Sequence, residues 1–289
     1  MPDKVLYKYI RKAFAAGRVI PFFGAGASVG ARLPTGRELT NQLGDLCGLA
    51  KEERGDLAKV AQYFAAVIGR KMLRASLHEI FDARYEPLAI HRYVAQQKQR
   101  PILVVTTNYD DLIEQAFREA GHPFDLVIHS TDNDRLLWWP HPDSDDAAEE
   151  APIEVMPNKL DIDLETRSAI YKMHGAVDRE DAERDQYVIS EDDYIDFLAR
   201  MTKNRAVPAI FAERFRDDHF LFLGYGLYDW NLRVVLNRIS RSDDVMSWAI
   251  QDGPNDVEQK LWEKRGVLIY DLKIEEFAEK LAGGYDDGD

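Results

Sequence analysis

His174 is the residue whose type and position most directly suggest acid–base chemistry. It follows the apolar run 169–173 and precedes Gly175. Histidine is the one side chain whose unperturbed pKa suits proton uptake near neutral pH, so His174 is a candidate general base. A structural histidine is the usual alternative, but the position of His174 matches that of three other polar or glycine-rich strand ends. The remaining histidines fall on expected helix faces, before prolines or in loops, and are interpreted as structural: His78, His91, His122, His129, His141 and His219.

Asn108 and Asp110 lie in a second polar segment, Thr106-Thr-Asn-Tyr-Asp110, directly after an apolar run. Strand ends of this kind are where an α/β sheet presents polar groups to a ligand. Both side chains could instead cap the helix that is expected to follow, because Asn and Asp accept hydrogen bonds from free backbone N–H groups. The residues alone leave both interpretations open.

Two glycine-rich turns also follow apolar runs: Gly24-Ala-Gly-Ala-Ser28 and Leu223-Gly-Tyr-Gly226. Glycines at such turns let the backbone approach a pyrophosphate, and a following helix N-terminus offers N–H groups and partial positive charge. The first turn departs from the Gly-x-Gly-x-x-Gly pattern, because position 29 is Val29 and the third glycine is Gly30. It also lacks the Lys-Ser/Thr of a P-loop. A tight turn without a ligand is the alternative.

Parallel strands are the elements that must position these four segments. Short apolar runs alternate with amphipathic stretches, which predicts an α/β fold with a Rossmann-like parallel sheet and helices on both faces. Ligands bind such sheets at the carboxyl ends of the strands, so we expect the four segments to converge at one edge. The predicted strands are 18–23, 101–106, 124–129, 169–173, 219–223, 245–250 and 265–270. The predicted helices are 3–16, 109–120, 191–201, 205–216, 228–239, 255–264 and 273–282.

We expect residues 1–289 to form one domain with two insertions. Residues 37–99 carry apolar side chains at helical spacing and no good strand, which predicts an inserted helical cap subdomain over the carboxyl edge. Residues 130–168 include Trp138-Trp139-Pro-His-Pro and the acidic run 143–150. We expect them to form an irregular acidic insertion that serves as a mobile lid or an interaction loop.

Charge and composition narrow the classes of function. The net charge of −14 argues against broad non-specific binding to nucleic acid, because that affinity comes mainly from neutralising phosphates. The chain shows no apolar run long enough to span a bilayer and no signal-peptide pattern, so we expect a cytoplasmic protein. Its single cysteine, Cys47, cannot form an internal disulfide or supply paired thiolates for zinc, and no metal is expected.

The ordered set Gly-Ala-Gly-Ala-Ser, Thr-Asn-Tyr-Asp, His-Gly and Gly-Tyr-Gly-Leu-x-Asp resembles the sirtuin superfamily. It looks closest to the zinc-free sirtuin-like NADases of bacterial anti-phage defence systems, and the resemblance covers roughly residues 18–270. Three departures are visible. The four-cysteine zinc module of protein-deacylating sirtuins is absent, the familiar Thr-Gln-Asn-Ile-Asp reads Thr106-Thr-Asn-Tyr-Asp110, and Gly226 stands where a serine is frequent.

The resemblance implies roles for individual residues. Asn108 and His174 would be the catalytic pair, and Asp110 would lie near the nicotinamide carboxamide. The first glycine turn would hold the pyrophosphate and nearby ribose of NAD⁺, and the last motif would contact its adenosine half. The binding residues implied in this way are Gly24, Ala25, Gly26 and Ser28, together with Gly224, Tyr225, Gly226 and Asp229.

The resulting hypothesis is an NAD⁺ glycohydrolase that cleaves NAD⁺, its substrate, to nicotinamide and ADP-ribose. Such an enzyme would act as the toxic effector of abortive infection against phage. Homo-oligomerisation or a partner protein, such as a helicase-like ATPase, would control it. The alternatives are an NAD⁺-dependent protein deacylase that uses the same site, a non-catalytic subunit that senses NAD⁺ or ADP-ribose, and a nuclease within a complex. The last is weakest, because no carboxylate cluster has convincing metal-ligand spacing.

Overall fold

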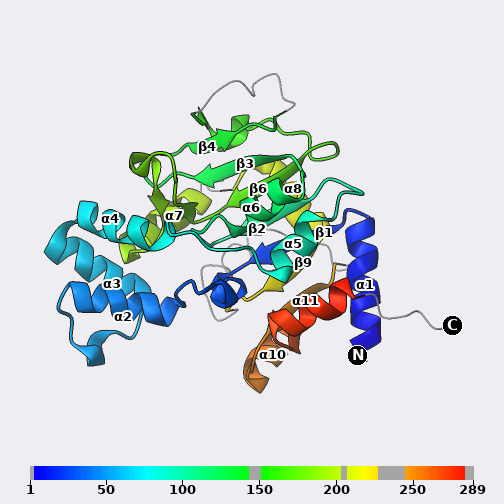
Figure 1. The fold of residues 1–289 in the computed structure, drawn as a ribbon, viewed down its shortest axis with the longest axis horizontal. Helices are drawn as coiled ribbons and strands as arrows, with labels where there is room; N and C mark the ends of the chain where they lie inside the picture. Colours follow the sequence, from blue (N-terminus) through cyan, green and yellow to red (C-terminus); the bar gives the residue numbers. More distant parts are fainter. Residues whose placement is uncertain (1–2, 143–150, 203–206, 227–244, 284–289) are drawn as a thin grey trace.

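The computed structural model describes residues 3–142, 151–202, 207–226 and 245–283 (Figure 1). Within these ranges, the apolar runs of the sequence become the strands of a nine-stranded sheet in the order β11-β10-β9-β1-β2-β6-β3-β4-β5. The predicted helix 228–239 and Asp229 lie outside the described residues. The strands are β1 (Val19–Phe23), β2 (Leu103–Thr106), β3 (Phe124–His129), β4 (Leu136–Trp139), β5 (Ile153–Val155), β6 (Ser168–Lys172), β9 (His219–Leu223), β10 (Ser247–Gln251) and β11 (Val267–Asp271).

The seven strands from β11 to β3 pair in parallel, and β4 and β5 continue the sheet in antiparallel pairing. The chain runs from β1 to β2 on one side and later returns to β9 on the other side of β1. This reversal makes a topological switch point between β1 and β9. Open α/β sheets bind ligands in the crevice that such a reversal leaves at the carboxyl ends of the strands.

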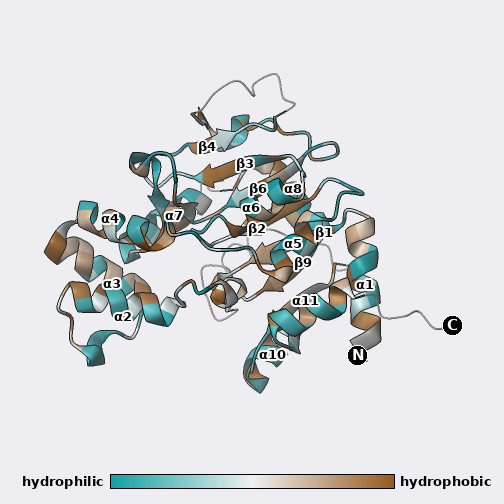
Figure 2. Ribbon diagram, viewed as in Figure 1, coloured by the Kyte–Doolittle hydropathy of each residue, from teal (hydrophilic) through white to brown (hydrophobic). Residues whose placement is uncertain are grey.

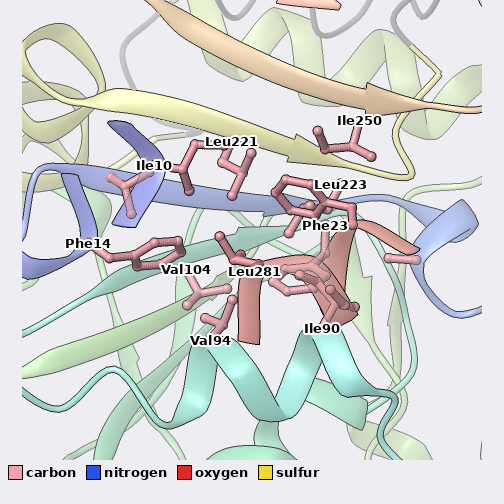
Figure 3. Packing of buried hydrophobic residues seen from close by; sticks show 14 of the residues in the cluster. Ile10, Phe14, Phe23, Ile90, Val94, Val104, Leu221, Leu223, Ile250 and Leu281 are labelled. Carbon is pink, nitrogen blue, oxygen red and sulfur yellow. The ribbon is translucent and has the colours of Figure 1, made fainter. Parts of the chain in front are cut away.

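Helices cover both faces of the sheet because successive strand residues point to opposite sides. Phe220 and Phe222 of β9 join one buried cluster, whereas Leu221 and Leu223 join the other. The first face is covered by α7 (Glu191–Thr202), α8 (Ala209–Asp217) and α10 (Asp256–Glu263). The second face, drawn in Figure 3, is covered by α1 (Asp3–Ala15), α5 (Ala89–Ala95), α6 (Leu112–Glu119) and α11 (Ile274–Ala282). The predicted α/β Rossmann-like fold is confirmed.

Three helices stand beside the sheet and form a third hydrophobic cluster (Figures 1 and 2). They are α2 (Gly36–Leu46), α3 (Leu57–Phe64), which continues through a π-helical turn over Ala65–Gly69, and α4 (Arg70–Phe81). Their cluster includes Tyr109 and Leu112 after β2 and Tyr187 beyond β6, so these helices pack against loops at the carboxyl edge. The helix α5 also falls within 37–99, yet it packs on the second face of the sheet against α6 and α11.

Residues 130–168 contain regular structure that the sequence did not predict. The strand β4 pairs with β3, and β5 pairs with β4. Buried Asp125 of β3 accepts a hydrogen bond from the Trp138 indole N–H at 2.8 Å and from the His141 backbone N–H at 3.0 Å. The adjacent tryptophans are therefore explained by strand pairing and by this buried carboxylate. Within the described ranges, no helix has both the length and the apolar character needed to cross a membrane.

Candidate active site

Strand register brings the four predicted segments to one edge of the sheet. Phe23 is paired with Leu223 on one side and with Thr106 on the other, and Thr106 is opposite Lys172. Because these residues end parallel strands, the turns that follow them leave the sheet on the same side. The glycine turn after β1, the loop 107–111, His174 and the turn after β9 are therefore neighbours.

The two glycine turns touch through their backbones. The Gly26 N–H donates to the Gly224 carbonyl at 2.9 Å, and the Gly24 N–H donates to the Leu223 carbonyl at 3.0 Å. A Cβ on Gly24 would lie 2.7 Å from the Tyr225 Cα, and one on Gly26 would lie 2.7 Å from the Gly224 carbonyl oxygen. The contact between the turns thus requires these glycines, independently of any ligand.

Helix capping differs from the expectation at the first turn. A short 3-10 helix over Ala25–Ala27 follows β1, and the next α-helix, α2, begins only at Gly36, where Thr35 and Glu38 form a capping box. Ala25 and Gly26 are exposed, whereas Ser28 is buried.

In the turn after β9, the ring of buried Tyr225 packs edge-on against Phe22, with ring centroids 5.0 Å apart.

Asn108 is held by the first glycine turn. Its Nδ2 donates to the Gly24 carbonyl at 3.0 Å and to the Ser28 Oγ at 3.0 Å. The Asn108 backbone N–H donates to the Thr106 Oγ1 at 3.0 Å. The residue is 8% exposed, and its side chain does not cap α6. These bonds fix the plane of the amide and hence the direction of its oxygen.

Asp110 makes the helix-capping contact that the sequence left open, together with a contact to the first glycine turn. Its Oδ1 accepts from the Leu112 backbone N–H at 3.2 Å, at the start of α6, and its Oδ2 accepts from the Ser28 hydroxyl at 3.0 Å. Burial raises the pKa of the Asp110 carboxyl above its ordinary value. Lys172 and the hydrogen bonds from Leu112 and Ser28 act against this rise, and Glu114 adds to it. Ser28 thereby joins Asn108 and Asp110 in one hydrogen-bonded chain.

His174 is buried at the end of β6, and its ring meets Tyr194 and Phe197 of α7 edge-on, with centroids 5.5 and 5.4 Å away. The His174 carbonyl accepts from the Val188 N–H at 2.9 Å. Gly175 has a φ of +89°, and a Cβ there would lie 2.1 Å from the Gln186 carbonyl oxygen. Gly175 is thus required by a hairpin, β7 (Gly175–Ala176) with β8 (Gln186–Tyr187), that begins directly after the histidine.

A second histidine, His129, lies close to His174. It ends β3, the neighbour of β6, and its ring meets the same Phe197 edge-on at 5.1 Å. Burial, reinforced by Arg200 and His174, lowers the pKa of His129 to about 3. Its Nδ1 is buried without a hydrogen-bond partner among the described residues. Its position at the end of an apolar strand, like that of His174, was the signal that could have singled it out.

One face of α4 contacts the hairpin segment and the start of α7 through residues spaced every four positions. Arg70 forms an ion pair with Asp193, and Arg74 donates to the backbone carbonyl of Asp185. The His78 Nδ1 lies 2.8 Å from the Asp185 Oδ2. The helical period places all three side chains on the same face. The α2–α4 cluster is therefore joined to the segment that follows His174.

A sequence-family model for the SIR2-like domain matches residues 102–270 of this chain. The chain belongs to the SIR2-like domain family. The matched part of this SIR2-like domain contains Asn108, Asp110, His174 and the turn after β9, while the glycine turn after β1 precedes it. The resemblance to sirtuin-like proteins that the motifs indicated is confirmed.

Curated relatives of the SIR2-like domain carry names that concern NAD⁺ and defence. The domain is 29% identical over 246 residues to "NAD(+) hydrolase ThsA" of Enterococcus faecium, covering 83% of this chain and 43% of the relative. It is 28% identical over 237 residues to the protein of the same name from Cytobacillus dafuensis, covering 82% and 41%. It is 24% identical over 275 residues to "Defense-associated sirtuin 2" of Bacillus subtilis, covering 91% and 24%. The chain therefore spans less than half the length of these relatives.

The sequence motifs did not identify two buried charged residues of the SIR2-like domain, Lys172 and Glu114. Lys172 is fully buried and forms an ion pair with Glu114 at 2.8 Å. A charged residue inside the apolar strand Ser168–Lys172 was the available signal, because a buried ammonium needs acceptors nearby. Among the described residues, no group of three or more His, Cys, Asp or Glu side chains is arranged to hold a metal ion.

Proposed function

We propose that this SIR2-like domain hydrolyses NAD⁺ to nicotinamide and ADP-ribose, as part of anti-phage defence. Its support is the similarity over four-fifths of the chain to proteins named NAD(+) hydrolase, together with Asn108 and His174 at one sheet edge. The observation that carries the proposal is the position of this pair at the carboxyl ends of neighbouring parallel strands. The glycine turns of the β1–β9 switch point lie beside it.

In the proposed reaction, the bond between the nicotinamide nitrogen and the ribose C1′ breaks, and the electron pair leaves with nicotinamide. A water molecule supplies the new bond to C1′ and loses one proton. His174 accepts that proton, which yields nicotinamide, ADP-ribose and H⁺ overall. The cation-like sugar that precedes attack is of the kind formed in glycoside hydrolysis.

Asn108 orients the ribose or the attacking water in this proposal. Its amide is held by Gly24 and Ser28, so little reorganisation is needed when substrate binds. Gly24, Ala25, Gly26 and Ser28 contact the pyrophosphate and nearby ribose, and Asp110 lies near the nicotinamide carboxamide. Gly224, Tyr225 and Gly226 contact the adenosine half in this proposal, and the same role is proposed for Asp229, which lies outside the described residues.

Control of the activity forms part of the proposal, because unrestrained NAD⁺ hydrolysis would poison a cell. We place the reaction in the cytoplasm and expect homo-oligomerisation or a partner protein, such as a helicase-like ATPase, to switch it on. Sedimentation velocity of the protein with and without NAD⁺ tests the first route. Specific activity that rises with protein concentration while the sedimentation coefficient stays unchanged would argue against activation by homo-oligomerisation.

The deciding experiment is product analysis of the purified chain incubated with NAD⁺, beside Asn108→Ala and His174→Ala. Nicotinamide and ADP-ribose should be released without an acyl acceptor, and both variants should abolish their release. His219→Ala is the matched control, because this histidine lies at the opposite end of β9 and contacts the Met246 carbonyl. Turnover that requires an acylated peptide would instead indicate a deacylase, and absence of NAD⁺ binding would overturn the proposal.

A further inference from the structure

Lys172 carries a fully buried ammonium group at the carboxyl end of β6, a strand with a neighbour on each side. It ends β6 on the face covered by α6, the face to which Ile170 of the same strand also points. Its Nζ donates to the backbone carbonyl of Asp110 and to the Glu114 Oε1, the latter at 2.8 Å. One side chain therefore links the strand that precedes His174 to the loop that carries Asn108.

Stability alone gives a poor account of this charge. Removing an ammonium and a carboxylate from water is unfavourable, and apolar residues of similar volume frequently replace a buried ion pair without loss of stability. The surroundings on this face are apolar side chains of the second cluster, such as Ile113 and Phe117 of α6. A lysine at this point is better explained by what its charge does for the neighbouring loop.

The contacts of Lys172 lead directly into the candidate site. The carbonyl that it binds belongs to Asp110, whose carboxylate accepts from Ser28, and the Ser28 Oγ in turn accepts from the Asn108 amide. Loop 107–111 is thus held at the Asp110 carbonyl by Lys172, and at the side chains of Asn108 and Asp110 by Ser28.

We propose that Lys172 is a positioning residue for the NAD⁺ reaction, which holds Asp110 and through it Asn108 in place. The part of this inference that concerns the reaction rests on the proposed function, whereas the contacts of Lys172 do not depend on it. An ionised Asp110 carboxylate can only accept a hydrogen bond from the Ser28 hydroxyl. The Ser28 oxygen is then left to accept a hydrogen bond from the Asn108 amide.

The groups that face Asp110 come from each element around it. Lys172 lies on β6, Glu114 lies on α6, and Ser28 follows β1. Burial raises the pKa of Asp110, Glu114 raises it further, and Lys172 lowers it. Removing the lysine charge must therefore raise the pKa of Asp110, whereas removing the glutamate charge must lower it.

The test compares kcat/KM for NAD⁺ against pH in three variants. Lys172→Met should lower kcat/KM by about tenfold or more and move its acid limb to higher pH by about half a unit or more. Lys172→Met/Glu114→Leu should regain thermal stability but keep the activity loss. Isosteric Glu114→Gln should move the acid limb to lower pH, a direction that a purely structural role does not give.

Arg214→Met is the matched control. Arg214 also binds backbone carbonyls, those of Gly17 and Leu164, and one buried carboxylate, that of Asp218, but at the opposite edge of the sheet. It should lower stability and leave the acid limb unchanged. Recovery of wild-type kcat/KM in the double variant, or acid limbs that do not move in opposite directions, would overturn the proposal.

A second readout does not depend on hydrolysis. Carbon-13 carboxyl labelling of aspartate, assigned with Asp110→Asn, gives the titration of Asp110 by nuclear magnetic resonance. Its midpoint should lie higher in Lys172→Met and lower in Glu114→Gln than in the unmodified chain. If NAD⁺ is not hydrolysed and these shifts still occur, the proposed function fails and with it the role of Lys172 in that reaction, whereas the effect of Lys172 on Asp110 stands. Unchanged midpoints would overturn the role of Lys172 alone.

Discussion

Gly224 and Ala27 are in direct backbone contact across the β1–β9 switch point. Gly224 has a φ of +62°, and a Cβ at this position would lie 2.1 Å from the Ala27 nitrogen. The two glycine turns therefore form one packed unit, and the pyrophosphate site proposed for them depends on a contact that only glycine allows.

Gly224→Ala should lower the free energy of unfolding by about 2–4 kcal/mol, because backbone strain and overpacking act together. It should also weaken NAD⁺ binding. Urea denaturation and calorimetric titration measure the two effects. Gly253→Ala is the matched control, since Gly253 has a φ of +64° but no atom within 4 Å of its Cβ position. Equal losses in both variants would show that the contact with Ala27 is unimportant.

Ser28→Ala should lower kcat/KM for NAD⁺ about 10- to 100-fold. It breaks the hydrogen-bonded chain between Asn108 and Asp110 and leaves buried groups without partners. Steady-state kinetics measure the change. In the control Ser168→Ala, the serine lost is buried at the opposite end of the sheet, where its hydroxyl contacts the Ile102 N–H and His122. That variant should lose stability but not kcat/KM, and a similar kinetic loss in both would count against a specific role for Ser28.

The protein should lose stability in mild acid through two buried histidines. Burial lowers the pKa of His91 and of His129 to about 3 each. In the unfolded chain the pKa of histidine is about 6.5, so between the two values the unfolded chain binds protons that the native chain does not. The free energy of unfolding must therefore fall as the pH falls through this window, by about 1.4 kcal/mol per pH unit for each histidine.

Urea denaturation at several pH values between 7 and 5 checks this slope. His91→Gln should reduce it by the share of one histidine, since the amide oxygen can replace the Nδ1 that accepts from the Leu88 N–H. A slope that the substitution does not change would mean that His91 is not held neutral by burial.

Asp185→Ala should loosen the hairpin over His174. The Asp185 carboxylate accepts from the Asp178 N–H at 2.7 Å and from the Tyr187 hydroxyl at 2.9 Å, and its side chain is only 1% exposed. Leaving these donors unpaired should cost about 2–4 kcal/mol and lower kcat more than it raises KM. Asp181→Ala, which removes an exposed carboxylate in the same hairpin, is the comparison. Equal kinetics in the two variants would contradict a role for the hairpin in placing His174.

Much of the fold can be predicted from the local pattern of apolar and polar residues in the sequence. The predicted strands match within about two residues, because doubly covered parallel strands are continuous apolar runs. The helix predicted for 109–120 begins only at Leu112, since Asn108 and Asp110 direct their side chains to Ser28 and Gly24. The strand β4 was missed because Trp138 and Trp139 stand beside Pro140, and its pairing partner was not evident from local sequence.

The candidate site was predictable as a set of strand ends but not as a network. Lys172 shows the reason: its acceptors, Asp110 and Glu114, lie 62 and 58 positions away in the sequence. Gly24 and Gly26 show another limit. From the sequence alone, these glycines are explained by the close approach of a ligand. The structure shows that the facing backbone of Gly224 and Tyr225 requires them as well.

The contacts along α4 also bear on how the molecule opens. Arg70, Arg74 and His78 join α4 to residues 123, 111 and 107 positions away, so α4 cannot detach without releasing the segment after His174. We therefore expect α4 and residues 175–189 to form one cooperative unit in native-state hydrogen exchange, with a shared opening free energy. Distinct opening free energies for the two segments would show that they fluctuate independently. Shared opening would mean that a local fluctuation of the helical cluster exposes the candidate base to solvent.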